Sequence, residues 1–197
     1  MTRKILIVTG DAGESYETLY AYHRFLEAGY EPVIAAPSRR WLHLVMHDFE
    51  PGWDTYVERP GYKMQSDITF DEVSTDDYEA ILIIGGRAPE YLRNNQRLLE
   101  MVREFHAKDK WVLAICHGIQ VLISAGLARG NCLTAYEHIR YEIEAGGGRY
   151  STKQAVRDGR IITGQTWQSH PEFYREVFSC FENSQEEAPV MATAASD

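Results

Sequence analysis

The chain has 197 residues, which suits one domain with a single buried core. Hydrophobic residues make up 44% and charged residues 25%, and no apolar run approaches the ~20 residues that cross a bilayer. The net charge of −9 argues against nucleic acid or an anionic membrane as a partner, because both require a basic surface.

Apolar runs alternate with amphipathic segments along most of the chain. The apolar runs predict buried strands at residues 4–8, 32–36, 80–84 and 111–115, with short strands near 132–134 and 161–163. The helical spacing of apolar residues predicts helices over residues 15–28, 94–107, 117–125 and 171–181. Strands separated by helices indicate an α/β fold of three layers, with a central, mostly parallel sheet covered on both faces.

Residues 37–69 interrupt this alternation and carry several aromatic and turn residues. We expect an insertion with short antiparallel strands, serving as a lid or a subunit contact. The insertion belongs to a single domain over residues 1–184, and residues 185–197, which show no periodicity, are expected to form a mobile tail.

The cysteine count and the start of the chain indicate a reducing, cytoplasmic setting. Cys116, Cys132 and Cys180 are too few, and odd in number, for a disulfide framework. The first residues lead straight into a strand-like run and lack the long apolar region of a secretory signal.

Cys116 stands where a predicted strand meets a predicted helix. The small residues Ala114 and Gly118 lie two positions before and two after it, as at a nucleophile elbow. A helix N-terminus favours the thiolate and lowers the pKa below the free value of ~8.5. We therefore predict that Cys116 is a nucleophile rather than a buried structural thiol, and that the adjacent His117 is either a general acid or base or a polar helix start.

Two further loops follow predicted strands, and the carboxyl ends of parallel strands meet at one sheet edge. Glu14 and Glu17 share a face if their segment is helical. They either stabilise the helix N-terminus or supply a carboxylic acid that shares a proton with the thiolate, with Glu17 the stronger candidate. Gly85 and Gly86 form either a tight turn or an oxyanion hole, whose donors would be the amides of Gly86 and His117.

The histidines and cysteines show no metal-ligand spacing, and no cofactor motif is present, so we expect neither a metal nor a cofactor. The segment His170-Pro171-Glu172 leaves an alternative open. His170 either starts a helix, since Pro171 suits a first helical position, or contributes to the site.

Three segments together resemble the ThiJ/PfpI superfamily, and most of all its PfpI-like members and the plant-type glyoxalase III proteins. They are residues 14–18, 85–90 and 114–120. The resemblance covers about residues 3–182, and its further carriers are residues 46–50, 63–70, 125–130, 134–136 and 168–173. It implies a flavodoxin-like sandwich and a homo-oligomer that is at least a dimer.

The resemblance also implies roles for single residues. Cys116 matches the reactive cysteine, Glu17 its paired glutamate, and His117 the histidine that follows the cysteine. Tyr136 matches a tyrosine near the site of peptidase-like members, and in some members an acidic residue of a neighbouring subunit orients the histidine. Ile119 departs from the proline or glutamine of many relatives, with a small expected effect.

The function implied first is that of glyoxalase III, which converts methylglyoxal or glyoxal with water to lactate or glycolate without glutathione or metal. Deglycation of early sugar-aldehyde adducts is a related activity of the same thiol. Three alternatives stay open: an intracellular cysteine peptidase, a glutamine amidotransferase-like hydrolase with a triad of Cys116, His170 and Glu172, and a redox-sensing stress chaperone. In the last, Cys116 would be oxidised to a sulfinic acid that Glu17 stabilises.

Overall fold

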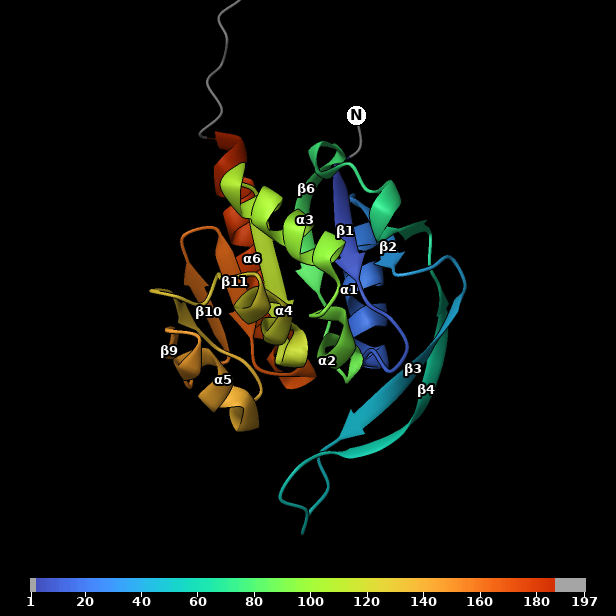
Figure 1. Cartoon of the computed structure of the whole chain (residues 1–197), viewed down its shortest axis with the longest axis vertical. Helices are drawn as coiled ribbons and strands as arrows, with labels where there is room; N and C mark the ends of the chain where they lie inside the picture. The colour runs from blue at the N-terminus through green and yellow to red at the C-terminus, as the bar shows by residue number, and fades with distance from the viewer. Residues whose placement is uncertain (1–2, 187–197) are drawn as a thin grey trace, which may run out of the picture.

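The computed structural model describes residues 3–186 and places a seven-stranded sheet at the centre of the molecule (Figure 1). The strand order is β10-β11-β7-β6-β1-β2-β5, and every neighbouring pair is parallel except β10 with β11. The strands span Lys4–Val8 (β1), Glu31–Ala36 (β2), Ile68–Thr69 (β5), Tyr78–Ile83 (β6), Trp111–Ile115 (β7), Ala155–Asp158 (β10) and Ile161–Gly164 (β11).

Helices cover both faces of this sheet. The first helix, α1 (Ser15–Glu27), and the last, α6 (His170–Glu186), lie behind the sheet in the view of Figure 1. In front lie α2 (Ala88–Leu92), α3 (Gln96–Ala107) and α4 (Ile119–Ser124). The predicted three-layer α/β fold with a mostly parallel sheet is therefore confirmed.

The central strands are buried on both sides, which explains their continuous apolar sequences. Every residue of β7 is buried, and in β1 only the first residue is partly exposed. No helix among the described residues has both the length and the apolar character needed to span a bilayer.

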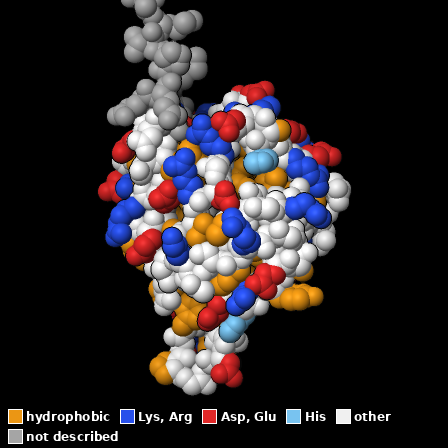
Figure 2. All heavy atoms as spheres, turned by 90° about the vertical axis from the view of Figure 1, so that its left-hand side faces the viewer, with side chains coloured by type: hydrophobic (Ala, Val, Ile, Leu, Met, Phe, Trp, Pro, Cys, Tyr) orange, Lys and Arg blue, Asp and Glu red, His pale blue; other side chains and the backbone are white. Residues whose placement is uncertain are grey.

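The insertion forms a long antiparallel hairpin of β3 (Trp41–Asp48) and β4 (Val57–Gln65). The strands are antiparallel as predicted, but at eight and nine residues they are longer than the short strands expected. The tip of the hairpin projects below the body in Figure 1 and again in Figure 2, where hydrophobic side chains lie on it. At that tip Trp53 is 60% exposed.

Several short elements were not predicted. They are α2, α5 (Arg140–Ala145), β9 (Arg149–Tyr150), which pairs with β8 (Cys132–Leu133), and the edge strand β10. Helix α6 continues to residue 186, so the first two residues of the expected tail are helical. The remainder of that tail lies outside the described residues.

Candidate active site

The three loops selected from the sequence meet at the carboxyl ends of β1, β6 and β7. The backbone amide of Glu14 donates to the Gly85 carbonyl oxygen at 3.2 Å, and the Gly85 amide donates to Glu17 Oε2 at 2.8 Å. The Arg87 amide donates to the Ala12 carbonyl oxygen at 2.7 Å. These bonds fix the loop after β1 against the turn after β6.

Cys116 follows β7 in a backbone conformation that side chains rarely adopt. Its φ is +55°, in the left-handed region, which costs a residue other than glycine roughly 1–2 kcal/mol. A short 3₁₀ turn, Cys116–Gly118, then leads into α4. A side chain at Gly118 would lie 2.3 Å from the Ile83 carbonyl oxygen, so the turn requires glycine there. The predicted elbow is present, and only 4% of Cys116 is exposed.

The side chain of His117 turns back onto the cysteine. Its Nδ1 lies 3.3 Å from Cys116 Sγ, so the pairing that the sequence left open is present. Burial lowers the pKa of His117 to about 4, with a smaller contribution from His47. The imidazole is therefore neutral at pH 7, and its Nδ1 can accept the thiol proton.

Glu17 occupies a fully buried position beside Cys116. Oε2 accepts the Gly85 amide, whereas the buried Oε1 has no hydrogen-bond partner within residues 3–186. Burial raises the pKa of Glu17 well above its usual range, and the charge of Glu14 raises it further, while the Gly85 amide and the Cys116 thiol oppose these effects. Glu17 therefore holds its proton at neutral pH.

The pKa of the Cys116 thiol differs from the sequence prediction. Burial raises its pKa well above the ordinary range, and the charge of an ionised Glu17 would raise it further, although the amides of His117 and Gly86 favour the thiolate. The predicted lowering by the helix N-terminus is wrong, because burial and an acidic neighbour outweigh the field of the six-residue α4. Burial thus raises the pKa of both Cys116 and Glu17, so both groups hold their protons at neutral pH.

Glu14 caps helix α1 and does not reach Cys116 by any hydrogen bond in the described part of the chain. Its Oε2 accepts the Glu17 amide at 2.6 Å, and its Oε1 accepts the His47 amide at 3.4 Å. Burial raises its pKa to about 7. Glu14 therefore caps the helix start, and Glu17 lies beside the sulfur of Cys116.

The glycine pair permits a close approach of three chain segments. A side chain at Gly85 would lie 2.6 Å from Cys116 Cβ and 2.7 Å from Glu17 Oε2. Gly86 has φ +76°, and its added carbon would lie 2.4 Å from the Glu14 nitrogen. The amides of Gly86 and His117 both stabilise the ionised sulfur, which places these two donors around the thiol.

Aromatic rings close the site from the hairpin and from the loop after β8. The ring of Tyr136 lies 5.3 Å from that of His117, and its hydroxyl is 2.9 Å from Thr55 Oγ1. Tyr56 meets His117 edge-on at 5.8 Å and stacks on His47 at 3.8 Å. The sequence pointed to Tyr136 but missed the hairpin residues, whose strand register depends on contacts far along the chain.

His170 is not brought to Cys116. Its buried ring stacks on Tyr20 at 4.4 Å, and burial lowers its pKa to about 4. Neither ring nitrogen bonds a partner in the part of the chain that the structure describes. Glu172 is exposed. The triad of Cys116, His170 and Glu172 is therefore not formed; His170 begins α6 and lines a cavity of about 470 Å³ between α1 and α6. Among the described residues no cluster could hold a metal ion.

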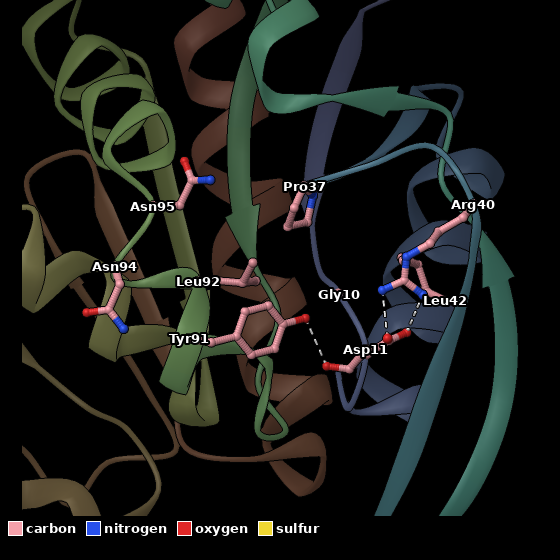
Figure 3. A pocket seen from close by; sticks show the side chains of 9 residues that line it. All are labelled: Gly10, Asp11, Pro37, Arg40, Leu42, Tyr91, Leu92, Asn94 and Asn95. Carbon is pink, nitrogen blue, oxygen red and sulfur yellow. Dashed lines mark hydrogen bonds and ion pairs between the residues drawn. The ribbon is translucent and has the colours of Figure 1, made fainter.

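A second cavity, of about 500 Å³, opens beside the loop after β1 (Figure 3). Arg40 bonds both carboxylate oxygens of Asp11 at 3.0 and 2.6 Å, and the Tyr91 hydroxyl donates to the Asp11 carbonyl oxygen at 3.1 Å. These polar groups satisfy one another, and their hydrogen bonds hold the loop that leads to Glu14 and into α1.

The protein is thus a mostly parallel α/β sandwich with a buried cysteine on a strained turn, and a glutamic acid and a histidine lie beside that cysteine. The family model described as the DJ-1/PfpI family matches residues 3–179, and the chain belongs to this family.

Two curated relatives and one solved structure illustrate the relationship. Protein DJ-1 homolog D of Arabidopsis thaliana is 34% identical over 90% of this chain, and the chain spans only 47% of that protein. Deglycase PfpI of Pyrococcus furiosus is 36% identical over 82% of this chain and 89% of its own length. A two-domain protein of Anabaena variabilis with DJ-1/ThiJ/PfpI-like and ferritin-like domains superposes with a TM-score of 0.80 at 26% identity, covering 92% of this chain and 48% of its own.

Proposed function

We propose that this chain is a cysteine-dependent enzyme that converts methylglyoxal or glyoxal to the 2-hydroxy acid, and that also removes early aldehyde adducts from amines and thiols. The observation that carries the proposal is the placement of Cys116 Sγ, 3.3 Å from His117 Nδ1 and beside the buried acid Glu17. Relatives named deglycases support the second activity.

The first step joins sulfur to the aldehyde carbon. His117 takes the thiol proton as Cys116 attacks, the amides of Gly86 and His117 stabilise the developing oxyanion, and Glu17 donates its proton to give a hemithioacetal. Glu17 is now a carboxylate and His117 an imidazolium.

The next steps move protons between the two carbons of the substrate. Glu17 removes the C1 hydrogen while His117 protonates the C2 oxygen, which gives an enediol. Glu17 then protonates C2 and His117 takes the C1 hydroxyl proton, which leaves a thioester. Water adds to the thioester and its released proton goes to Glu17, while His117 returns a proton to the departing sulfur. Both residues end in their starting states.

The burial of the thiol favours a small substrate. Cys116 is 4% exposed, and Tyr56 of the hairpin loop meets the ring of the neighbouring His117 at 5.8 Å. A planar dicarbonyl fits such a setting better than an extended peptide, which needs an open groove. Substrate size therefore distinguishes this proposal from the cysteine peptidase alternative.

We also propose a homo-oligomer in a reducing cytoplasm. Helix α1 exposes apolar side chains, with Leu26 52% and Tyr16 50% exposed, and the described residues contain no disulfide. Sedimentation of the whole chain at micromolar concentration tests the oligomer, and a purely monomeric species would contradict it.

The decisive experiment measures lactate formed from methylglyoxal without glutathione, in the wild type, Cys116→Ala and Glu17→Gln. We expect turnover in the wild type and its loss in both variants. Absence of wild-type turnover on both methylglyoxal and a glycated thiol would sink the proposal, and peptide, glutamine and peroxide assays on the same thiol would follow.

A further inference from the structure

A hydrogen-bonded chain of three residues runs from the hairpin to the glycine turn. His47 Nε2 lies 2.9 Å from Glu58 Oε2, and Arg87 bonds both oxygens of Glu58 at 2.6 and 2.8 Å. The Arg87 guanidinium lowers the pKa of Glu58 to about 2, so this residue is a carboxylate at neutral pH. A carboxylate only accepts, and the His47 ring therefore carries its proton on Nε2.

The ring of His47 depends on Glu58 for its place. His47 is 3% exposed, and its Nδ1 is buried without a hydrogen-bond partner, an arrangement that costs free energy. Among the described residues the bond to Glu58 is the single hydrogen bond of this ring. Loss of the carboxylate therefore removes the contact that offsets burial of the imidazole.

His47 in turn supports two parts of the active site. Its ring stacks on Tyr56 at 3.8 Å, and Tyr56 meets the ring of His117 edge-on at 5.8 Å. Its backbone amide donates to Glu14 Oε1, and the other oxygen of Glu14 accepts the amide of Glu17. His47 thus contacts Tyr56, which lies against His117, and Glu14, which bonds the backbone of Glu17.

Arg87 joins the same chain to the glycine turn. Its backbone amide donates to the Ala12 carbonyl oxygen at 2.7 Å, in the loop that leads to Glu14. The side chain of Arg87 reaches Glu58 on β4, so the turn after β6 and the hairpin are held together by one residue.

We propose that Glu58 is a positioning residue for the reaction at Cys116, acting through His47 and Tyr56 on the His117 ring. This inference rests on the proposed function for its kinetic consequence, but its structural consequence can be measured without substrate. Glu58 does not touch Cys116, so its effect on the reaction is indirect. Its loss should let His47 and Tyr56 move and displace His117 from the sulfur, which lowers kcat more than it raises KM.

The test compares Glu58→Gln with Glu50→Gln, a matched change at another hairpin carboxylate that pairs with Arg59 instead. In Glu58→Gln we expect kcat for methylglyoxal to fall about tenfold or more with KM within about threefold. In Glu50→Gln both stay within about twofold of the wild type.

Two readouts without turnover separate failure of this proposal from failure of the proposed function. Stacking on Tyr56 shifts the ring-proton NMR signals of His47 upfield, and these signals, assigned with His47→Gln, should move in Glu58→Gln but not in Glu50→Gln. The rate at which iodoacetamide alkylates Cys116 at pH 7 should also change in Glu58→Gln alone.

A folded Glu58→Gln protein with wild-type His47 signals overturns the proposal, whatever its activity. So does a kcat within twofold of the wild type. If the wild type does not turn over methylglyoxal, the NMR and alkylation results decide the proposal by themselves. A double-mutant cycle of Glu58→Gln with Arg87→Gln should show coupled effects on kcat, because both changes break the same series of hydrogen bonds. Strictly additive effects would contradict the proposal.

Discussion

The strand-end loops and the β3–β4 hairpin hold the active site by different physical means. Around Cys116 and Glu17 the loops are buried and packed so closely that single carbon atoms would clash. Strand β3 of the hairpin reaches the core through Leu42 and Leu44, and the Val45 amide donates to the Gly13 carbonyl oxygen at 2.9 Å. Strand β4 has no fully buried residue and is held by pairs at its surface such as Arg87 with Glu58. The groups of the proposed chemistry therefore lie in closely packed loops, and the hairpin contacts them from outside.

Removal of the nucleophile should give the largest effect on the loop side of this comparison. We expect Cys116→Ala to lower kcat/KM by roughly 10⁴-fold or more while the protein stays folded. Cys132→Ala, which changes a thiol outside the site, is the control and should keep wild-type activity. Steady-state kinetics with methylglyoxal checks both, and activity in Cys116→Ala above a hundredth of the wild type would contradict a covalent role.

The addition of one methyl group should have different effects in the two regions. In Gly85→Ala the methyl group would lie 2.6 Å from Cys116 Cβ, so we expect kcat to fall roughly 100-fold as the reacting groups move apart. In Gly61→Ala, on the hairpin, the methyl group would lie 2.6 Å from Ser15 Oγ and 2.9 Å from the Val45 carbonyl carbon.

For Gly61→Ala we expect a loss of about 1–3 kcal/mol in the free energy of unfolding and a kcat within about threefold of the wild type. Urea denaturation and kinetics on the same samples measure the two quantities. An equal fall of kcat in both variants would show that the hairpin and the loops act as one unit rather than contributing separately to the site.

The buried acid of the loops should make stability depend on pH. Burial raises the pKa of Glu14 from 4.5 to about 7 in the folded state, so the folded protein keeps a proton that the unfolded chain has lost. The stabilisation is complete below about pH 4.5 and is lost as the pH rises to about 7.

Glu14→Gln should therefore remove a contribution of roughly 1–3 kcal/mol by which the unfolding free energy falls between about pH 4.5 and 7. Urea denaturation of the variant and the wild type at several pH values provides the measurement. The remaining pH dependence combines Glu17, whose raised pKa acts in the same direction, with His117 and His170, whose lowered pKa values act in the opposite direction. A variant whose slope equals that of the wild type would show that Glu14 is already ionised at low pH.

The smallest effect is expected at the hairpin surface. Arg59 pairs with Asp48 at 2.9 Å and with Glu50, and it is 42% exposed. Exposed pairs contribute little and are screened by salt, so Arg59→Ala should lower Tm by about 3 °C or less in 0.1 M salt and leave kcat unchanged. A larger shift that persists in 1 M salt would show that the tip is held by more than its charges.

The sequence predicts the loop side of the molecule well. Strands β1 and β7 have the predicted bounds, because their continuous apolar runs are buried on both faces. The rule that carboxyl ends of parallel strands share an edge then places Cys116, Glu17 and Gly85 together, as observed.

The hairpin side could not be predicted in the same way. Its role depends on which side chains of β3 and β4 face the body, and this register is set by distant contacts such as the Trp167 indole with the His47 carbonyl oxygen at 2.8 Å. Burial is equally hidden from the sequence, which is why the predicted lowering of the Cys116 pKa was wrong. The packing of His170 on α6 against Tyr20 on α1 is a third feature that the sequence does not reveal.

The left-handed backbone at Cys116 affects which amino acids this position accepts when the sequence changes. The free energy stored there is a property of the main chain, and glycine would relieve it while abolishing the thiol. A library screened only for heat resistance should therefore tend to discard the cysteine, whereas one screened for aldehyde tolerance should keep it. Under the proposed function, a cysteine kept at this turn through such a screen would report selection for chemistry against the preference of the backbone.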